Sequence, residues 1–338
     1  MAKNISPEIQ ASTQHILKKA LGAKAKVKGF EWSDGGGLFN KVFKVDTTEG
    51  FFVLKMECDR IFFATRKDQI ENEVHGNEIF QKAHIPCANI LAYDFTKNEI
   101  GARYIFSEHI KNDMEDWPLW GNTDGLDETT KEEITRQFKE AILKMRTMTT
   151  SHFGSISPSG TLGRHESYGG YYRSTLNLLI EDSENCGVFD GEELAIVKQA
   201  VAEPLLYSKK YVPTFVHGDF AYHNTIWGNT GGGENKLYVY DFGNAYFGLP
   251  YLEEIINKIH GKDADIIGEM GLDRHLYENN LIGDFERMFW TVTEKLTEDY
   301  AYMRDWMISG IEAAKKDTSR KHITDFVDKC RNIFGRIG

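Results

Sequence analysis

Residues 215–224 read FVHGDFAYHN and residues 237–244 read LYVYDFGN, so two short apolar runs each lead to an aspartate. Asn224 follows Asp219 by five positions and precedes Asp241 by 17. The oxygens of an Asp, an Asn and a second Asp suit Mg²⁺, and a carboxylate beside a metal-bound phosphate can accept the proton of a hydroxyl. The pattern therefore predicts phosphoryl transfer, with Asp219 as the proton acceptor and with Asn224 and Asp241 as the metal ligands.

The part of the chain before these runs is rich in expected strands. Apolar periodicity and turn signals predict a helix at residues 68–83 and strands at residues 27–32, 41–45, 51–56, 90–95 and 103–107. A turn that contains Gly35, Gly36 and Gly37 separates the first two strands, and Lys55 lies on the third.

After about residue 110 the character of the sequence changes. Two short strands are expected near Val216 and Val239, and apolar residues at helical spacing predict helices at residues 129–148, 168–180, 191–206, 252–259 and 284–309. A strand-rich front and a helix-rich back predict an α+β fold with two lobes, the first formed by residues 1–107 and the second by residues 108–338.

The HGD motif at 217–219, Asn224 and the DFG motif at 241–243 resemble the catalytic and metal motifs of the aminoglycoside phosphotransferase and choline kinase-like family. These are small-molecule relatives of protein kinases, and HGD in place of HRD points to the small-molecule branch. Residues 248–253 resemble the GDPxxD run of that family, with departures at Leu249 and Glu253. The resemblance implies a two-lobed protein-kinase-like fold that binds ATP and Mg²⁺ between its lobes and phosphorylates a hydroxyl.

The same resemblance assigns residues of the first lobe to the nucleotide. It implies that the glycine turn covers the ATP phosphates, that Lys55 contacts them and that Glu73 orients Lys55, whereas Glu71 and Glu78 fit less well. It also implies that backbone groups of Glu108 and Ile110 bind the edge of the adenine.

Two histidines of the motif and two aromatic runs have other expectations. His217 is expected to brace the catalytic loop rather than to act as a base, and His223 is given no role. The aromatic residues of 152–156 and 168–172 are expected to pack in the core rather than to line a substrate cleft.

Composition limits the partners and the compartment. The 338 residues include 40 Lys and Arg against 51 Asp and Glu, a net charge of −11, and an acidic chain repels the backbone of a nucleic acid. No run approaches the ~18 consecutive apolar residues of a membrane span, and no apolar signal region follows the N-terminal lysine. The four cysteines lie far apart, as in a reducing cytosol. We therefore expect a cytoplasmic enzyme without nucleic-acid or membrane partners.

The acceptor is predicted from charge. Residues 250–300 hold 12 Asp and Glu against 5 Lys and Arg, and a cleft lined by one sign of charge concentrates ligands of the opposite sign. A cationic hydroxyl compound, such as an aminoglycoside or another amino alcohol, is the expected acceptor. A neutral sugar-like or peptide-like hydroxyl is the alternative, in which case the acidic region is only a solvated surface.

Other functions from the same fold stay open. A protein kinase is disfavoured by HGD and by the absence of an Ala-Pro-Glu segment after residue 243. A catalytically silent nucleotide-binding module is disfavoured because Lys55, Asp219, Asn224 and Asp241 are all present. A nucleotidyl-transferring relative is not excluded by the sequence, although the intact proton acceptor argues against it.

Overall fold

The computed structural model describes residues 5–32, 40–57, 67–111, 126–186, 212–230 and 233–249, with a few positions between 191 and 198. Several expectations lie outside the described residues: the glycine turn of Gly35, Gly36 and Gly37, most of the helix at 191–206, the helices at 252–259 and 284–309, and the acidic region.

The first lobe is built on an antiparallel sheet that has five strands within the described residues, in the order β1-β2-β3-β5-β4. The strands are β1 (Val27–Trp32), β2 (Asn40–Thr47), β3 (Gly50–Glu57), β4 (Ile90–Asp94) and β5 (Tyr104–Glu108). In β3, Leu54 and Met56 are buried on one face with the core of the lobe. Because successive side chains of a strand alternate between faces, Lys55 lies on the opposite face, opposite Val42 of β2.

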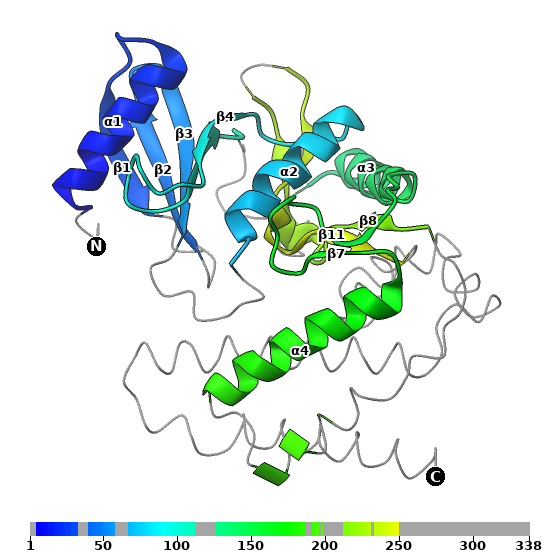
Figure 1. The fold of residues 1–338 in the computed structure, drawn as a ribbon. Coiled ribbons are helices and arrows are strands. Elements are labelled where there is room, and N and C mark those ends of the chain that lie inside the picture. The colour runs from blue at the N-terminus through cyan, green and yellow to red at the C-terminus, as the bar shows by residue number, and fades with distance from the viewer. Residues whose placement is uncertain are drawn as a thin grey trace.

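Helix α1 (Pro7–Leu21) covers the buried face of this sheet (Figure 1). Its hydroxyl cap is Ser6, whose side chain accepts from the backbone N–H of Ile9, and a proline occupies the first turn. Ile16 and Leu17 are fully buried against the sheet. This helix was not expected from the sequence.

Helix α2 (Gln69–Lys82) lies between the sheet and the second lobe (Figure 1). Its bounds fall within the expected range of 68–83. On the second-lobe side it packs against the single-turn helix η3 (Phe242–Asn244), which contains most of the DFG motif. Helix α2 therefore joins the sheet to one of the two predicted catalytic segments.

The second lobe combines helices with short strands. Besides η3, its described helices include α3 (Glu128–Met145), α4 (Tyr168–Cys186) and the single turn η2 (Tyr222–Asn224). Its strands are β6 (Phe153–Ser155), β7 (Arg164–His165), β8 (Thr214–Val216), β9 (Thr225–Gly228), β10 (Lys236–Val239) and β11 (Tyr246–Gly248). Among the described residues, four of them form the sheet β7-β6-β11-β8, and β9 pairs with β10. The predicted catalytic residues follow β8 and β10.

The core of the second lobe lies under helix α3. Ile134, Phe138 and Ile142 of that helix are buried with Phe215 and Val239 from the strands that precede the two motifs. The ring of Phe138 also stacks on that of Phe220, at 4.5 Å between centroids. This packing fixes both strand ends, and with them the backbone of the site.

The aromatic runs pack as expected from the sequence. Phe153 and Tyr168 are buried and meet edge to face with ring centroids 5.7 Å apart, and buried Tyr171 packs against Tyr246 at 5.5 Å. The expected division at residues 107 and 108 falls at the end of β5, and as a domain boundary it stays a prediction. Of the helices in the described part of the chain, none combines the length and apolar character that crossing a membrane requires.

Candidate active site

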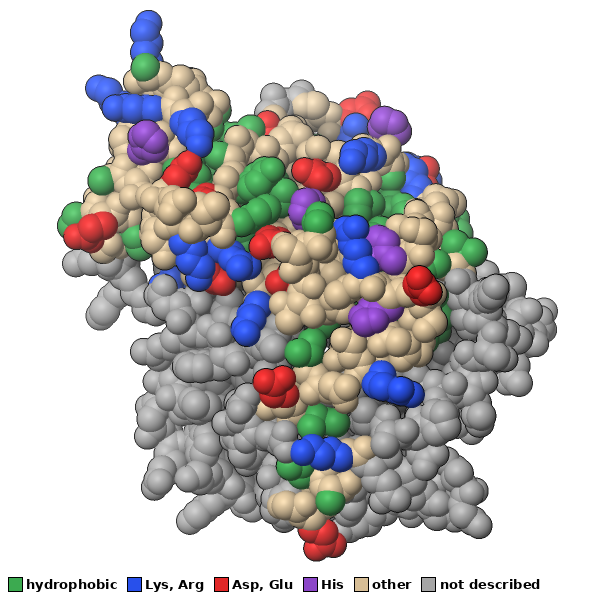
Figure 2. Space-filling view, viewed as in Figure 1, with side chains coloured by type: hydrophobic (Ala, Val, Ile, Leu, Met, Phe, Trp, Pro, Cys, Tyr) green, Lys and Arg blue, Asp and Glu red, His purple; other side chains and the backbone are tan. Residues whose placement is uncertain are grey.

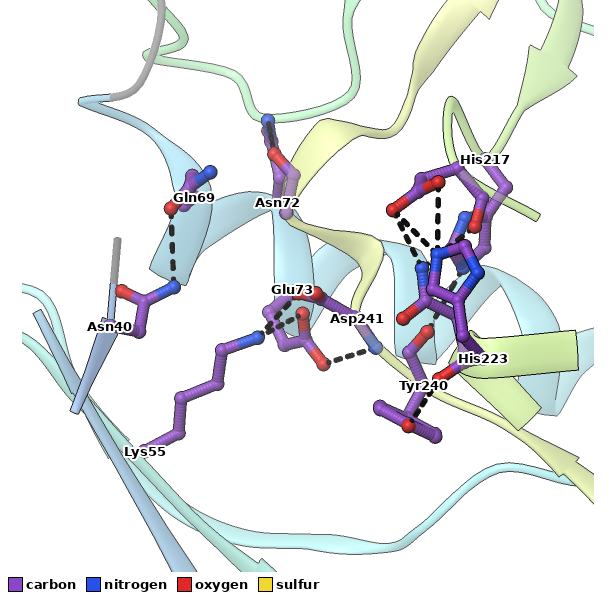
Figure 3. A network of polar contacts seen from close by, with 12 residues as sticks. Asn40, Lys55, Gln69, Asn72, Glu73, His217, His223, Tyr240 and Asp241 are labelled. Carbon is purple, nitrogen blue, oxygen red and sulfur yellow. Dashed lines mark hydrogen bonds and ion pairs between the residues drawn. The ribbon is translucent and has the colours of Figure 1, made fainter. Parts of the chain in front are cut away.

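One largely buried amino group joins three elements at the centre of the site (Figure 3). Nζ of Lys55 on β3 lies 3.0 Å from Oε2 of Glu73 on α2 and 2.7 Å from Oδ1 of Asp241, which directly precedes η3. The backbone N–H of Asp241 donates to Oε1 of Glu73 at 3.1 Å. The pairing expected between Lys55 and Glu73 is thus formed, while Glu71 and Glu78 contact other groups.

The charges of this cluster do not cancel. Burial disfavours the charge of Lys55, but Asp241 and Glu73 outweigh that cost and hold the pKa of Lys55 above its usual value. Burial also opposes the charge of Asp241, yet Lys55 keeps the pKa of Asp241 below its usual range. At Glu73, burial outweighs the attraction of Lys55, repulsion from Asp241 adds to it, and the pKa is raised. With both carboxylates ionised, the cluster carries a formal charge of −1, and a bound cation would favour that state because an opposite charge lowers the pKa of a carboxyl.

Helix α2 approaches the DFG segment closely because Gly76 has no side chain. A Cβ atom at Gly76 would lie 2.5 Å from Cβ of Phe242, well inside van der Waals contact. Nδ2 of Asn72, on the same helix, donates to the carbonyl of Gly243 at 3.2 Å. Asp241 itself has a left-handed backbone, with φ 63°, which residues with a side chain seldom adopt. These contacts fix the strained backbone and place Asp241 beside Lys55.

Gly218 lets the chain turn after strand β8 so that Asp219 reaches the site. Gly218 has φ +82°, and a Cβ atom there would lie 2.6 Å from the carbonyl oxygen of Asn244. Only glycine fits both the backbone conformation and this close approach. The structure thus gives a physical reason for the glycine in the HGD motif.

The carboxylate of Asp219 is held by the turn that follows it. Nδ2 of Asn224 donates to Oδ2 of Asp219 at 2.9 Å and to its carbonyl at 2.7 Å. Nε2 of His223 lies 3.2 Å from each of the two carboxylate oxygens. The hydroxyl of Tyr240 donates to the carbonyl of His223 at 2.6 Å, and the backbone N–H of Tyr240 donates to the carbonyl of Asn224 at 3.1 Å. The side chain of Asp219 remains 34% exposed, so it is oriented yet accessible.

The contact of His223 was not expected from the sequence. The only local signal is its spacing, four positions after Asp219, across a turn that contains η2. Tyr240 gave no signal either, because it reaches the turn from the end of β10, 17 positions away.

His217 supports the catalytic loop from inside the core. It is fully buried, and its ring lies 5.1 Å from that of Phe242 and 5.8 Å from that of Phe220. Nε2 donates to the carbonyl of Tyr240 at 3.1 Å. Burial lowers the pKa of His217 to about 4, so the ring is neutral at physiological pH. These contacts support the bracing role expected from the sequence.

The expected magnesium ligands have suitable oxygen atoms. Asn224 uses Nδ2 for its bonds to Asp219, and its Oδ1 forms no hydrogen bond with a described residue. Asp241 gives Oδ1 to Lys55 and keeps a second carboxylate oxygen. Mg²⁺ in nucleotide enzymes takes only one or two protein ligands, the rest being phosphate and water. The donor set and the surplus negative charge fit such an ion. The described residues contain no group of three or more His, Cys, Asp or Glu that could hold a metal.

Residues 108–111, which lead from β5 into the second lobe, are held at both ends by backbone hydrogen bonds. The N–H of Glu108 donates to the carbonyl of Asn89 at 3.0 Å, so only its carbonyl could accept from an adenine. Beyond Ile110, Lys111 and Asn229 exchange backbone hydrogen bonds of 2.9 and 3.0 Å. No described residue accepts the N–H of Ile110. Glu108 and Ile110 therefore offer one acceptor and one donor, and adenine binding there stays a prediction.

Comparison with known proteins identifies the family. The model of the phosphotransferase enzyme family, APH, matches residues 33–254, which is more than half of the chain and includes both motifs. The chain belongs to this family and is a small-molecule kinase, a phosphotransferase whose acceptor is an alcohol group. No curated protein matches the chain significantly.

Solved structures with low sequence identity share the kinase-like fold. A structure described as a putative fructosamine-3-kinase from Haemophilus somnus 129PT has a TM-score of 0.65 at 13% identity, covering 95% of this chain and 97% of its own. A putative aminoglycoside phosphotransferase from Ralstonia eutropha JMP134 has a TM-score of 0.58 at 15% identity, covering 95% of each chain. A thermostable mutant of aminoglycoside phosphotransferase APH(4)-Ia, in complex with AMP-PNP and hygromycin B, has a TM-score of 0.56 at 18% identity, covering 94% and 98%.

Proposed function

We propose that this enzyme transfers the γ-phosphoryl group of ATP to a hydroxyl of a cationic small molecule. The observation that carries the proposal is a pair of clusters, Lys55–Glu73–Asp241 and Asp219–Asn224. They combine a largely buried cation, oxygen atoms suited to a metal and an accessible carboxylate, and the charges of Asp219 and Asp241 interact. Phosphoryl transfer needs little else, because positioning and charge neutralisation supply most of the rate.

Each residue has one part in the proposed reaction. Lys55, held by Glu73, binds the α- and β-phosphates. Asn224 and Asp241 would hold Mg²⁺, and the ion would supply positive charge beside the phosphates. Asp219 accepts the proton of the acceptor hydroxyl. At the same time the oxygen of that hydroxyl bonds to the γ-phosphorus, and the bond from the γ-phosphorus to the β-phosphate oxygen breaks. The products are a phosphate monoester and ADP.

The nucleotide is proposed to be ATP from the family resemblance and from the neighbours. Structures of two thermostable APH(4)-Ia mutants are described, one with AMP-PNP and one with ADP. A GDP complex of an aminoglycoside 2′-phosphotransferase has the same fold at a TM-score of 0.52. Parallel titrations of the parent enzyme with ATP and GTP decide between the two, and tighter binding of GTP contradicts this part of the proposal.

The acceptor class rests on charge and on what the neighbours bind. On the face drawn in Figure 2, acidic and basic side chains are interspersed over the described residues. The negative surplus that we invoke is counted from the sequence of residues 250–300, with 12 Asp and Glu against 5 Lys and Arg. The APH(4)-Ia neighbour is described with hygromycin B. A neutral sugar-like or peptide-like hydroxyl is the second candidate. The neighbour described as a putative fructosamine-3-kinase keeps a sugar-derived acceptor under consideration.

A screen of hydroxyl compounds with Mg·ATP tests the function. The panel pairs aminoglycosides and amino alcohols with uncharged polyols of similar size, and mass spectrometry reads the products. A gain of one phosphate on a cationic acceptor is expected. A gain of one nucleotide instead indicates nucleotidyl transfer, and no change with any compound supports a silent nucleotide-binding module.

Ionic strength then tests the charge argument on the best acceptor found. Attraction between opposite charges weakens with salt, so kcat/KM for a cationic acceptor is expected to fall as ionic strength rises. A neutral or anionic best acceptor, or a kcat/KM that ignores salt, contradicts the cationic assignment. We also place the enzyme in the cytoplasm, since its four cysteines are widely separated, and fractionation of expressing cells tests that location.

A further inference from the structure

Glu71 lies two residues before Glu73 on helix α2 but faces a different partner. Its Oε2 accepts hydrogen bonds from the hydroxyls of Ser157 and Ser159, both at 2.6 Å. Its Oε1 lies 3.3 Å from Nη1 of Arg103, which precedes β5. Glu71 is 8% exposed, and Ser157 is fully buried. One carboxylate thus joins α2 both to its own lobe and to a loop of the second lobe.

Asp68, one helical turn before Glu71, also connects the start of α2 to this loop of the second lobe. The carboxylate of Asp68, which directly precedes α2, accepts hydrogen bonds from the backbone N–H and the hydroxyl of Thr161. On the first-lobe side, Nη1 of Arg103 donates to the carbonyl of Lys67 at 2.9 Å. The start of α2 is therefore fixed to residues 157–161 by two carboxylates rather than by one.

The loop that receives these carboxylates is itself held in one shape. The carbonyl of Gly163 accepts from Ser155 at 2.8 Å, and the N–H of Gly163 donates to Gly160 at 2.9 Å. A Cβ atom at Gly154, where φ is +105°, would lie 2.3 Å from the carbonyl of Gly163, and one at Gly160 would lie 1.6 Å from Oγ of Ser155. Glycines thus allow the close contacts within the loop. The loop in turn fixes the hydroxyls of Ser157, Ser159 and Thr161 that donate to the carboxylates at the start of α2.

Glu71 is suited to hold the helix because it stays charged. Burial opposes ionisation of Glu71, but the hydroxyls of Ser157 and Ser159 and the charge of Arg103 outweigh it and hold its pKa below the usual value. A buried carboxylate that loses its partners carries a large desolvation cost. Movement of α2 away from the loop is therefore opposed.

We infer that Glu71 is a positioning residue that fixes α2 on the second lobe and so keeps Glu73 on Lys55. We call this set of contacts the α2 latch, formed by Asp68, Glu71, Ser157, Ser159 and Thr161. Glu71 touches neither Lys55 nor the proposed nucleotide site, so it acts through Glu73. The latch assembles the nucleotide-binding cluster before nucleotide arrives. The inference rests on the proposed roles of Lys55 and Glu73.

A double-mutant cycle of Glu71→Gln and Glu73→Ala tests the latch with two measurements. The first is the Kd for Mg·ATP. The second is the rate at which Lys55 is acetylated without nucleotide, read by mass spectrometry of the peptide. Residues in contact show coupling equivalent to about 2- to 150-fold. We expect Glu71→Gln to change both quantities by about 10-fold in the parent and by less than about 2-fold in the Glu73→Ala background. The matched control is Glu78→Gln, on the exposed side of the same helix, which should change neither.

Two outcomes overturn the inference. One is a Glu71→Gln enzyme that melts at a lower temperature yet keeps the parent values of both measurements, since Glu71 then only stabilises the fold. The other is an equal effect of Glu71→Gln with and without Glu73, since Glu71 then acts by another route. If Glu71→Gln does not fold, Ser159→Ala at an exposed position takes its place in the cycle. If the parent binds no nucleotide, the proposed function is wrong, and Lys55 labelling alone decides the latch.

Discussion

Lys55 and Asp241 are 186 positions apart in the sequence, yet Nζ of the lysine lies 2.7 Å from Oδ1 of the aspartate. The contact joins the sheet of the first lobe to the DFG segment of the second. Helix α2 lies between them and adds Glu73 to the same amino group at 3.0 Å. The contacts that the proposed nucleotide binding needs from Lys55, Glu73 and Asp241 are therefore formed.

Replacement of Lys55 by Ala is expected to raise the KM for ATP or to lower kcat. The substitution removes charge-assisted hydrogen bonds to the phosphates, each worth about 1.5–3 kcal/mol, and leaves Glu73 and Asp241 to repel each other. Glu73→Ala should act in the same direction but more weakly. Steady-state kinetics measure both, with Lys18→Ala, on an exposed position of α1, as the control. A Lys55→Ala enzyme with parental kinetics would contradict the assignment.

Replacement of Asp241 by Ala is expected to abolish most Mg·ATP binding and turnover. The change removes the charged metal ligand, whereas Asn224→Ala removes a neutral one and should be milder. Calorimetric titration with ATP, with and without Mg²⁺, separates loss of the metal from loss of the nucleotide. If Asp241→Ala binds Mg·ATP as tightly as the parent does, Asp241 is not a magnesium ligand.

Replacement of Gly218 by Ala is expected to destabilise the catalytic loop. An alanine would have to keep φ near +82° and place its Cβ 2.6 Å from the carbonyl of Asn244. Backbone strain of this kind costs about 1–3 kcal/mol, before any rearrangement around the clash. Chemical denaturation and kcat should both report the loss. Gly29→Ala is the matched control, because a Cβ there meets nothing within 4 Å, and an equal effect at both glycines would refute the argument.

The stability of the fold is expected to fall as the pH drops below the ordinary range of histidine. The pKa of buried His217 is lowered from 6.5 to about 4. Between these values the unfolded chain binds a proton at this position and the folded chain does not, so acid favours unfolding. The contribution of His217 to the free energy of unfolding is fully present above the pKa of histidine in the unfolded chain. It decreases by about 2 kcal/mol between about pH 7.5 and about pH 5. Urea unfolding at both values should show a smaller difference for His217→Gln, and an unchanged difference would exclude His217 as its source.

Much of the fold follows from local patterns, and the exceptions have physical causes. Strand β1 has the expected bounds, and α2 begins and ends one residue inside its expected range. Helix α1 was missed because its buried stripe is narrow, with only Thr13, Ile16 and Leu17 inside. The three-residue strands β6 and β11 were missed because they exist through pairing of distant residues such as Ser155 and Tyr246.

In the candidate site, the motif residues could be predicted from the sequence, but the contacts that orient them could not. Asp219, Asn224 and Asp241 stand in short motifs, so sequence and family resemblance could assign them. The contacts that orient them could not be predicted, because they depend on three-dimensional packing. The partners of Glu71 are 86 and 88 positions away along the chain, and no local pattern relates them.

The proposed role of Asp219, which is to accept a proton from the acceptor hydroxyl during phosphoryl transfer, can be tested with one paired measurement. The rate of phosphate transfer to the best acceptor is compared between the parent and Asp219→Asn, with the Kd for Mg·ATP measured in parallel. General-base contributions are about 10²–10⁴-fold. We expect kcat to fall by that order in Asp219→Asn, with the Kd for Mg·ATP nearly unchanged. Turnover of Asp219→Asn near the parental rate would contradict it.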